Sequence, residues 1–327
     1  MAVDLLLLNE EAIHVTAQKK SPDPINQHYV PQCMLELFSK EKNDKGKSVL
    51  WVISKDAKKK RKSSIEEIFA KNHLYTKIIG SEKVFTVEKT LGNIEGDFAT
   101  LYREKISKRL PLSDIEHLNL CAFVATMMQR TLRFKKNIES FYDQRIALVK
   151  GAGADAHSTE LHVAKLEAEK KDAHKQGLID SFPEITKMLM KMNVAFFCAE
   201  KSGEAFITSD DPCHMFNPDL QWQRFYSPGL GQEHTEVKLA LSRNTLLLLS
   251  WSNYRGYFPM ESSGVDDQNR MTRAYADKDI ATSREKMKLV WRSPLPWDLC
   301  FFCKFLMKKT MVLINRLQLA FEYGRIR

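Results

Sequence analysis

Apolar residues recur at helical spacing through the middle of the chain. The strongest pattern begins at Ser113, which forms an S-x-x-E capping box with Glu116. Apolar positions then continue at helical spacing through Ile146, and the pattern stops at Gly151. We therefore predict one long central helix over about 113–151.

Shorter helical patterns flank this central helix. Residues 155–178 are helix-prone but polar, with alternating charges, which indicates a solvent-facing helical insertion. Ser64 and Glu67 resemble a second capping box that opens a short helix. We also predict helices over 91–110, from about 183 to 191, and from about 266 to 275.

Alternating and continuous apolar runs predict β-strands, mainly in the second half of the chain. Asn193–Cys198 and Glu204–Thr208 read as a hairpin across a Lys-Ser-Gly turn. The other predicted strands cover residues 49–53, 83–87, 236–241 and 246–251. We therefore predict an α+β fold, with a helical middle, a long central helix, and antiparallel strands mainly in the second half.

Proline and charge patterns suggest the division of the chain. Residues 1–25 read as a flexible N-terminal arm that ends near a Ser-Pro-Asp-Pro segment, where two prolines disfavour helix. Residues 26–290 read as one α+β domain that includes the polar insertion. Residues 291–327 read as a basic, apolar tail.

The composition is that of a globular protein, and the charge is uneven. The 327 residues are 43% hydrophobic and 28% charged, with a net charge of +9. The last 44 residues hold ten Lys/Arg and three Asp/Glu, so residues 1–283 carry only +2. The run Lys58–Lys62 is either a phosphate-contacting segment or a solvated loop. A nucleic acid or another acidic partner bound by this run or by the tail is therefore the predicted type of partner.

Cysteine usage and the lack of a leader favour a cytoplasmic protein. The six cysteines show no repeated pair spacing, which indicates reduced thiols. Four apolar residues near the start, flanked by acidic ones, are too few for a signal peptide. Residues 299–321 are apolar but hold four basic residues, so we predict no transmembrane segment; a basic interfacial helix is the alternative.

Two motifs carry a family resemblance. His28-Tyr-Val-Pro-Gln32 lies near the start, and Phe206-Ile-Thr-Ser-Asp-Asp-Pro212 lies past the midpoint. In this order they resemble the domain of unknown function 4238 family, over roughly residues 26–285. The sequence departs from the family pattern after Ser242, where Arg243 replaces a proline. The resemblance implies a common fold and no known activity.

Further segments agree with the family in order, and they supply candidate residues. Arg130 follows Gln129 late in the long helix, and its planar guanidinium can clamp a phosphate. The alternative is a buried ion pair, for instance with Glu95. Asn269 lies in the late helix and either anchors a loop through its amide or lines a cleft.

The two motifs contain the groups best suited to acid–base chemistry. His28 titrates near neutral pH and can act as a general acid or base, or it can simply bind a backbone carbonyl. Ser209 and Asp210 end a strand, where they can bind a substrate or merely cap a turn. Asp210, His28 and His214 are conceivable metal ligands, but no spacing favours them, so we assign no metal and no cofactor.

Two functions remain open at this point. The first is a hydrolase for a phosphate-containing or nucleic-acid substrate, with a site made of His28, Arg130, Ser209, Asp210 and Asn269. The second is a non-catalytic binding module in which these polar residues are structural. The first requires that folding bring His28 and Asp210 to one hollow.

Overall fold

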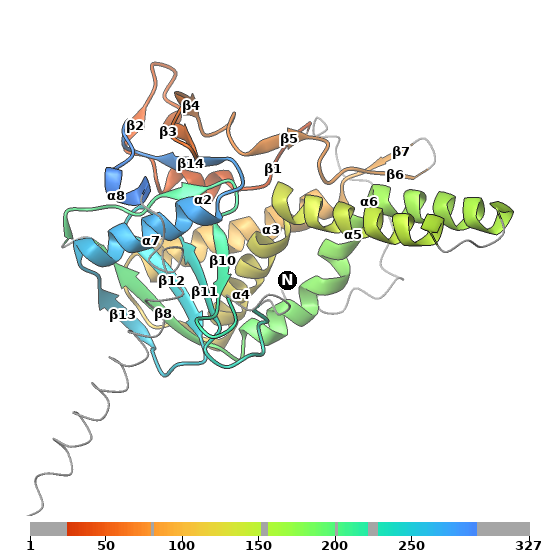
Figure 1. Cartoon of the computed structure of the whole chain (residues 1–327). Coiled ribbons are helices and arrows are strands. Elements are labelled where there is room, and N and C mark those ends of the chain that lie inside the picture. Colours follow the sequence, from red (N-terminus) through yellow and green to blue (C-terminus); the bar gives the residue numbers. More distant parts are fainter. Residues whose placement is uncertain (1–24, 80–81, 152–155, 200–201, 222–227, 293–327) are drawn as a thin grey trace, which may run out of the picture.

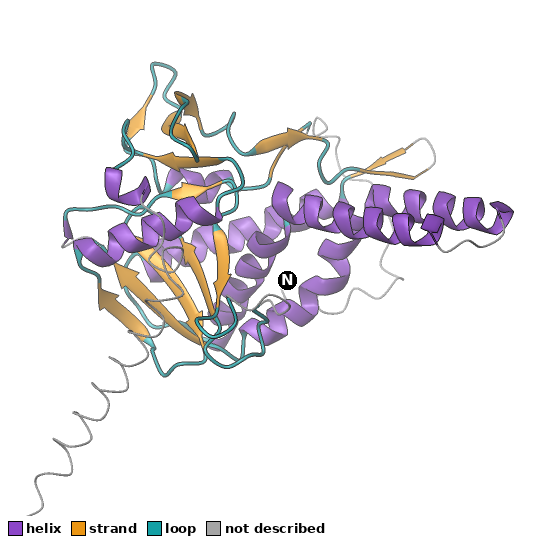
Figure 2. Ribbon diagram, in the orientation of Figure 1, coloured by secondary structure: helices purple, strands orange, loops and turns teal. Residues whose placement is uncertain are grey.

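The computed structural model describes residues 25–79, 82–151, 156–199, 202–221 and 228–292. The predicted arm and nearly all of the predicted tail lie outside these residues, so both remain predictions. Within the described residues the chain is α+β, as predicted, with helices in the middle and antiparallel sheets (Figures 1 and 2). No described helix combines the length and the apolar character that crossing a membrane requires.

The bounds of the elements are as follows. The helices are α2 (Gln32–Glu36), α3 (Thr86–Leu101), a π-helical turn (Tyr102–Ile106), α4 (Asp114–Gln129), α5 (Leu132–Gly151), α6 (Ala156–Leu189), α7 (Ser262–Tyr275) and α8 (Leu289–Arg292). The strands are β1 (Asn26–His28), β2 (Glu41–Lys42), β3 (Ser48–Ser54), β4 (Lys60–Ser64), β5 (Ala70–Asn72), β6 (Lys77–Ile79), β7 (Glu82–Val84), β8 (Asn193–Cys198), β9 (Thr208–Ser209), β10 (Cys213–Phe216), β11 (Glu236–Ala240), β12 (Thr245–Ser250), β13 (Gly256–Pro259) and β14 (Asp279–Thr282).

The structure has two five-stranded sheets among the described residues. The one with more residues, called the larger sheet, contributes to the main hydrophobic core. Its strand order is β10-β11-β12-β8-β13, and all neighbours are antiparallel except β13 and β8. Every residue of β12 is buried, as expected for a continuous apolar run at the centre of a sheet. The buried side chains of α4 join this sheet in the main hydrophobic cluster, so α4 is the central helix of the core.

The other five-stranded sheet, which has fewer residues and is called the smaller sheet, joins early strands of the chain to late ones. Its order is β2-β3-β14-β9, and β4 adds to the free side of β3. Helix α7 contacts β9 and β14 and lies between the two sheets (Figure 1). An early strand therefore pairs with the last strand of the family region.

The predicted long central helix forms, but it is interrupted. The capping box of Ser113 and Glu116 is confirmed, and both of its hydrogen bonds are present. Helix α4 then ends at Gln129, with Arg130 as its C-cap. The Thr131 hydroxyl accepts the N–H of Phe134, which starts α5 in a new direction.

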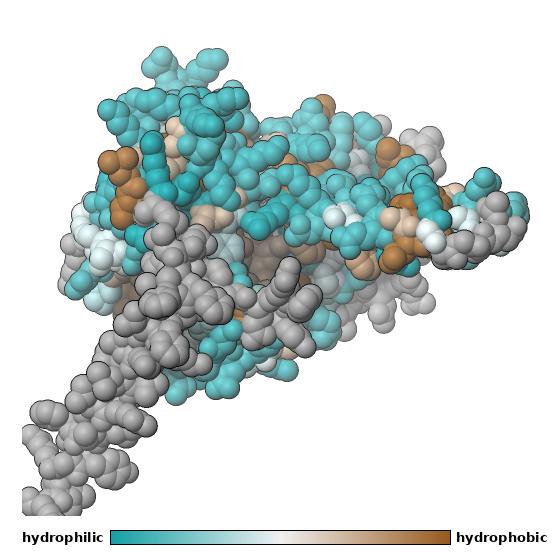
Figure 3. Space-filling model, viewed as in Figure 1, coloured by the Kyte–Doolittle hydropathy of each residue, from teal (hydrophilic) through white to brown (hydrophobic). Residues whose placement is uncertain are grey.

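Helices α5 and α6 form a projecting hairpin. Two separate helices were predicted over residues 155–178 and about 183–191, but α6 is one helix that spans both and continues through Pro183. Packing against α4 and α5 outweighs the local cost of the proline. Leu148 and Leu161 near the far end of the hairpin are 74% and 67% exposed, and apolar surface is visible there in Figure 3.

Two local predictions are wrong. Ser64 ends β4, and the residues after it form turns instead of a helix. Residues 193–198 do not pair with 204–208, because β8 lies between β12 and β13 while β9 pairs with β14. Instead of strand β8, the side chain of Asn269 forms hydrogen bonds with the backbone of Ala205 and Ile207.

Candidate functional site

Arg130 is sealed inside the fold. Its side chain is 1% exposed, and Nη1 lies 2.8 Å from Glu95 Oε1 on α3. Nη2 donates to the carbonyl oxygen of His28 at 2.5 Å, and the carbonyl of Arg130 accepts the hydroxyl of Tyr75 at 2.7 Å. Arg130 thus connects β1, the segment after β5 and α3 to the break between α4 and α5. Its contact with Glu95 is the ion pair that was one of the two roles predicted for it.

The His28 ring forms hydrogen bonds with a backbone carbonyl and with a side chain of its own motif. Its Nε2 lies 3.2 Å from the carbonyl oxygen of Ile65, and Gln32 Nε2 lies 3.3 Å from its Nδ1. Because a carbonyl can only accept, Nε2 carries the proton. Burial lowers the pKa of His28, which the carbonyl of Ile65 opposes, so the ring is neutral at pH 7.

Asp210 caps a turn of the backbone. Its two carboxylate oxygens accept the N–H groups of Asp277, Lys278 and Asp279 at 2.9, 2.8 and 3.2 Å. Burial raises the pKa of Asp210 to about 6, although the three N–H groups favour the charged form. Ser209 is fully buried, and its hydroxyl accepts the N–H of Asp211 at 3.2 Å.

Asn269 bridges α7 to the segment before β9. Its Oδ1 accepts the N–H of Ile207 at 3.0 Å, and its Nδ2 donates to the carbonyl of Ala205 at 2.9 Å. The amide thus replaces a strand partner for this backbone, and the side chain is fully buried. This is the loop-anchoring geometry, one of the two roles predicted for Asn269.

His214 contacts helix α7. Its Nε2 is 3.0 Å from Gln268 Nε2, and its ring stacks on Tyr275 with centroids 5.0 Å apart. Burial lowers the pKa of His214 to about 3. Within the part of the chain that the structure describes, no cluster of three or more His, Cys, Asp or Glu side chains is suited to a metal ion.

Of Tyr29 and His28 in the first motif, Tyr29 is the one on which the charge of Asp210 acts. Burial and then the charge of Asp210 raise the pKa of Tyr29, so these two side chains lie within electrostatic reach. By contrast, the charges that act on His28 are those of Glu95 and Arg130. Tyr29 lies inside the first motif but is not among the five candidate residues predicted from the sequence.

Two partly exposed cations, Arg133 and Lys55, lie near Asp210 and Asp211. Arg133 Nη1 lies 3.5 Å from Asp211 Oδ2 and donates to the carbonyl of Tyr275 at 2.6 Å. Lys55 Nζ donates to two carbonyls at the end of α7, and burial lowers its pKa. Both cations are thus engaged with the chain itself.

Three cavities among the described residues lie away from these groups. One has a volume of about 570 Å³ and two have about 350 Å³ each. None of these three is lined by His28, Arg130, Ser209, Asp210 or Asn269. The structure therefore places His28 and Arg130 in one buried group and Ser209 and Asp210 in another, with Asn269 bridging α7 to the segment before β9. None of these three cavities opens onto the five residues.

A strongly basic segment covers β2, β3 and β4 together with the loops that connect them. Residues 40–62 hold ten Lys/Arg and three Asp/Glu, a net charge of +7, so the remainder of residues 1–283 carries −5. On β4, Lys60 and Lys62 place their ammonium groups 5.7 and 5.9 Å from the ring centre of Trp51. This end of the molecule is hydrophilic in Figure 3.

The cations of β4 have exposed partners. Lys60 pairs with Glu285, Lys62 with Glu41 and, just before the strand, Lys58 with Asp56. Exposed pairs of this kind contribute roughly 0–1 kcal/mol each, so phosphate groups can displace them. The basic run is evident in the sequence, but the position of Trp51 beside it depends on the pairing of β3 with β4.

Comparison with known proteins gives one match. The sequence model of a family described as "Protein of unknown function (DUF4238)" matches residues 26–286. The match spans β1 to β14 and includes both motifs. No curated protein and no solved structure matches the chain.

Proposed function

The chain belongs to the DUF4238 family, and from this premise we propose that it is a binding module for nucleic acid, with its motif residues in structural roles. The observation that carries the proposal is the basic surface of β2–β4, where Lys60 and Lys62 flank Trp51. Cations beside an aromatic ring suit a nucleic acid, because phosphates attract the cations and bases stack on the ring.

The separation of charge supports the same proposal. A net charge of +7 in residues 40–62, against −5 in the remainder of residues 1–283, orients an approaching polyanion toward β2–β4. Strand β4 pairs only with β3 among the described strands, so its outer edge is free to face a partner. The motif residues contribute the rigid support for this sheet, since Asp210 caps the turn that leads into β14.

The test compares charge-reversed full-length proteins. Fluorescence anisotropy with a labelled single-stranded oligonucleotide is measured at 50 and 200 mM salt. Lys60→Glu/Lys62→Glu should weaken binding by about tenfold or more and flatten the salt dependence, because each phosphate contact contributes roughly 0.7–0.9 to the logarithmic salt slope. The matched control is Lys150→Glu/Lys171→Glu on the exposed faces of α5 and α6.

Two results would count against the proposal. Equal affinity of the β4 variant and the control would show that β4 makes no contact. A loss confined to Lys308→Glu/Lys309→Glu would assign the binding to the basic tail instead.

A hydrolase acting on a phosphate-containing substrate is the second candidate. The observation in its favour is that the charge of Asp210 in the second motif acts on Tyr29 in the first, and a carboxyl with a pKa of about 6 can exchange a proton near neutral pH. Hydrolysis of nucleotides and of single-stranded nucleic acid that is lost in both Tyr29→Phe and Asp210→Asn, with folding retained, would support it. Activity that survives both changes would exclude a site at these two residues.

A further inference from the structure

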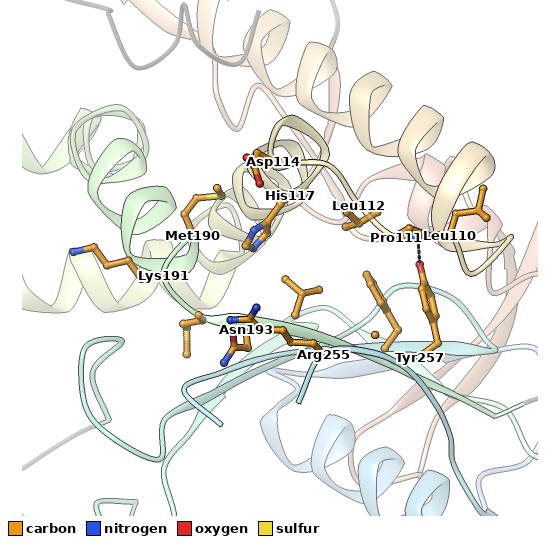
Figure 4. Close-up of a pocket in the computed structure, with 14 residues that line it drawn as sticks. Leu110, Pro111, Leu112, Asp114, His117, Met190, Lys191, Asn193, Arg255 and Tyr257 are labelled. Carbon is orange, nitrogen blue, oxygen red and sulfur yellow. Dashed lines mark hydrogen bonds between the residues drawn. The ribbon is translucent and has the colours of Figure 1, made fainter. Parts of the chain in front are cut away.

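A deep groove lies on the face between the start of α4 and the larger sheet (Figure 4). Its volume is about 570 Å³, which is within the range of roughly 300–1,000 Å³ typical of small-molecule sites. Residues 110–117 form one wall, β8 and β13 form the opposite wall, and the chain between α6 and β8 closes one end. None of the five motif candidates lines it.

The body of the groove is apolar. Phe196 and Tyr257 stack across the parallel pair of β8 and β13, with ring centroids 4.7 Å apart and 15° between their planes. The Tyr257 hydroxyl donates to the carbonyl of Leu110 at 3.0 Å and joins the two walls (Figure 4). Met190 and Met192 add flexible side chains that adapt to the shape of a ligand.

The polar groups gather at the other end. His117 projects from α4 toward Asn193 and Arg255 in Figure 4, and its Nε2 is buried with no hydrogen-bond partner among the described residues. Leaving such a group without a partner costs free energy that a ligand atom can recover. Burial lowers the pKa of His117, with Asp114 opposing, so the ring is a neutral hydrogen-bonding group at pH 7.

Arg255 supplies the charge for this end. Its Nε donates to Asn193 Oδ1 at 2.7 Å, and Asn193 Nδ2 donates to the carbonyl of Ser252 at 2.8 Å, so the guanidinium is oriented. Within the described ranges Arg255 has no other hydrogen bond or ion pair, which leaves its terminal nitrogens to a ligand. Lys191 and Arg255 outnumber the one carboxylate of the groove, that of Asp114.

We propose that this groove binds a small organic carboxylate with a flat apolar body. The carboxylate accepts hydrogen bonds from Arg255 and His117, and the apolar body lies against Tyr257, Phe196 and the two methionines. This site is separate from the basic surface of β4 and does not depend on nucleic-acid binding.

The experiment uses 2-naphthoate as the probe and 2-naphthylmethanol as its neutral counterpart, titrated into the full-length protein by calorimetry. Arg255→Gln should weaken naphthoate binding by about tenfold or more, because a charge-assisted hydrogen bond is lost. It should change the affinity for the alcohol by less than about twofold. The control Arg103→Gln, on an exposed arginine outside the groove, should leave both affinities unchanged.

A second variant tests the location of the apolar body. Leu112→Trp in the loop before α4 fills the groove and should abolish binding of both probes, with circular dichroism verifying the fold. Lys60→Glu/Lys62→Glu should bind naphthoate as the unaltered protein does, which separates this site from the proposed nucleic-acid surface. Absence of naphthoate binding, or binding that neither Arg255→Gln nor Leu112→Trp changes, would overturn the proposal.

Discussion

Removing the charge of Arg130 tests whether this residue stabilises the fold. In Arg130→Met, Glu95 loses its ion-pair partner, but its side chain is 24% exposed and water can hydrate the carboxylate. The carbonyl of His28 also loses its donor. Deleting one partner of a buried pair costs about 3–5 kcal/mol, and the hydration of Glu95 places this variant near the lower end, at about 3 kcal/mol. At roughly 2–4 °C per kcal/mol, the melting temperature should fall by about 6–12 °C.

The reverse deletion should cost more. Glu95→Gln leaves the guanidinium of Arg130 uncompensated at 1% exposure, where water cannot reach it. We expect about 4–5 kcal/mol for this variant. The double variant removes both charges and should be no less stable than Arg130→Met alone, so the two effects should be far from additive.

Urea unfolding followed by tryptophan fluorescence measures all three variants, with an unchanged m-value as the sign of an intact two-state transition. A double variant as unstable as the sum of the single ones would refute the ion-pair reasoning. An Arg130→Met protein with unaltered stability but lost binding or activity would show that Arg130 acts on a ligand instead.

Three further predictions concern buried polar groups. Burial raises the pKa of Glu88 from 4.5 to about 7, so the folded chain holds this proton more tightly than the unfolded chain does, and stability falls as pH rises from 4.5 to 7. Glu88→Gln should therefore be stabilising by about 1–2 kcal/mol at pH 8, after allowance for partial exposure, and neutral near pH 4; urea unfolding at both pH values checks this, and an equal effect at both would contradict it. Asp210→Asn retains one acceptor for three N–H groups, so hydrogen exchange at residues 277–279 should become faster, while removal of a buried carboxylate whose pKa is raised to about 6 offsets part of the lost stability; unchanged exchange there would refute the capping role. Asn269→Ala leaves a buried N–H and a buried carbonyl before β9 without partners and should cost about 2–4 kcal/mol in thermal unfolding, whereas a loss below about 0.5 kcal/mol would show that water replaces the amide.

The pairing of strands shows where sequence reasoning stops. Strands β11 and β12 were each predicted from the sequence, and they pair across the short turn that joins them. Residues 193–198 and 204–208 were predicted to pair, and this is wrong, because β8 pairs with strands that follow it by about fifty residues or more. Local periodicity carries no information about which distant edge offers the better hydrogen bonds and packing.

The candidate residues show a similar limit. The sequence identified Arg130 as a charged residue late in an apolar helix and Asn269 as a polar residue of the late helix, and both are buried. It left open whether each contacts a ligand or the chain, because the partner groups lie 35 or more positions away. The groove of His117 and Arg255 gave no sequence signal, since its residues are ordinary ones on segments far apart in the chain.

The sequence by itself determined the fold class, the family, the capped start of α4 and the basic run of β4. Each of these depends on residues close together in the chain, or on a motif read in order. Only the tertiary structure decided that Asp210 comes within electrostatic reach of Tyr29, that Arg130 pairs with Glu95, and that α4 and β13 enclose a groove. These contacts join distant segments, and the free energy that selects them comes from burying the whole core at once, which no local pattern contains.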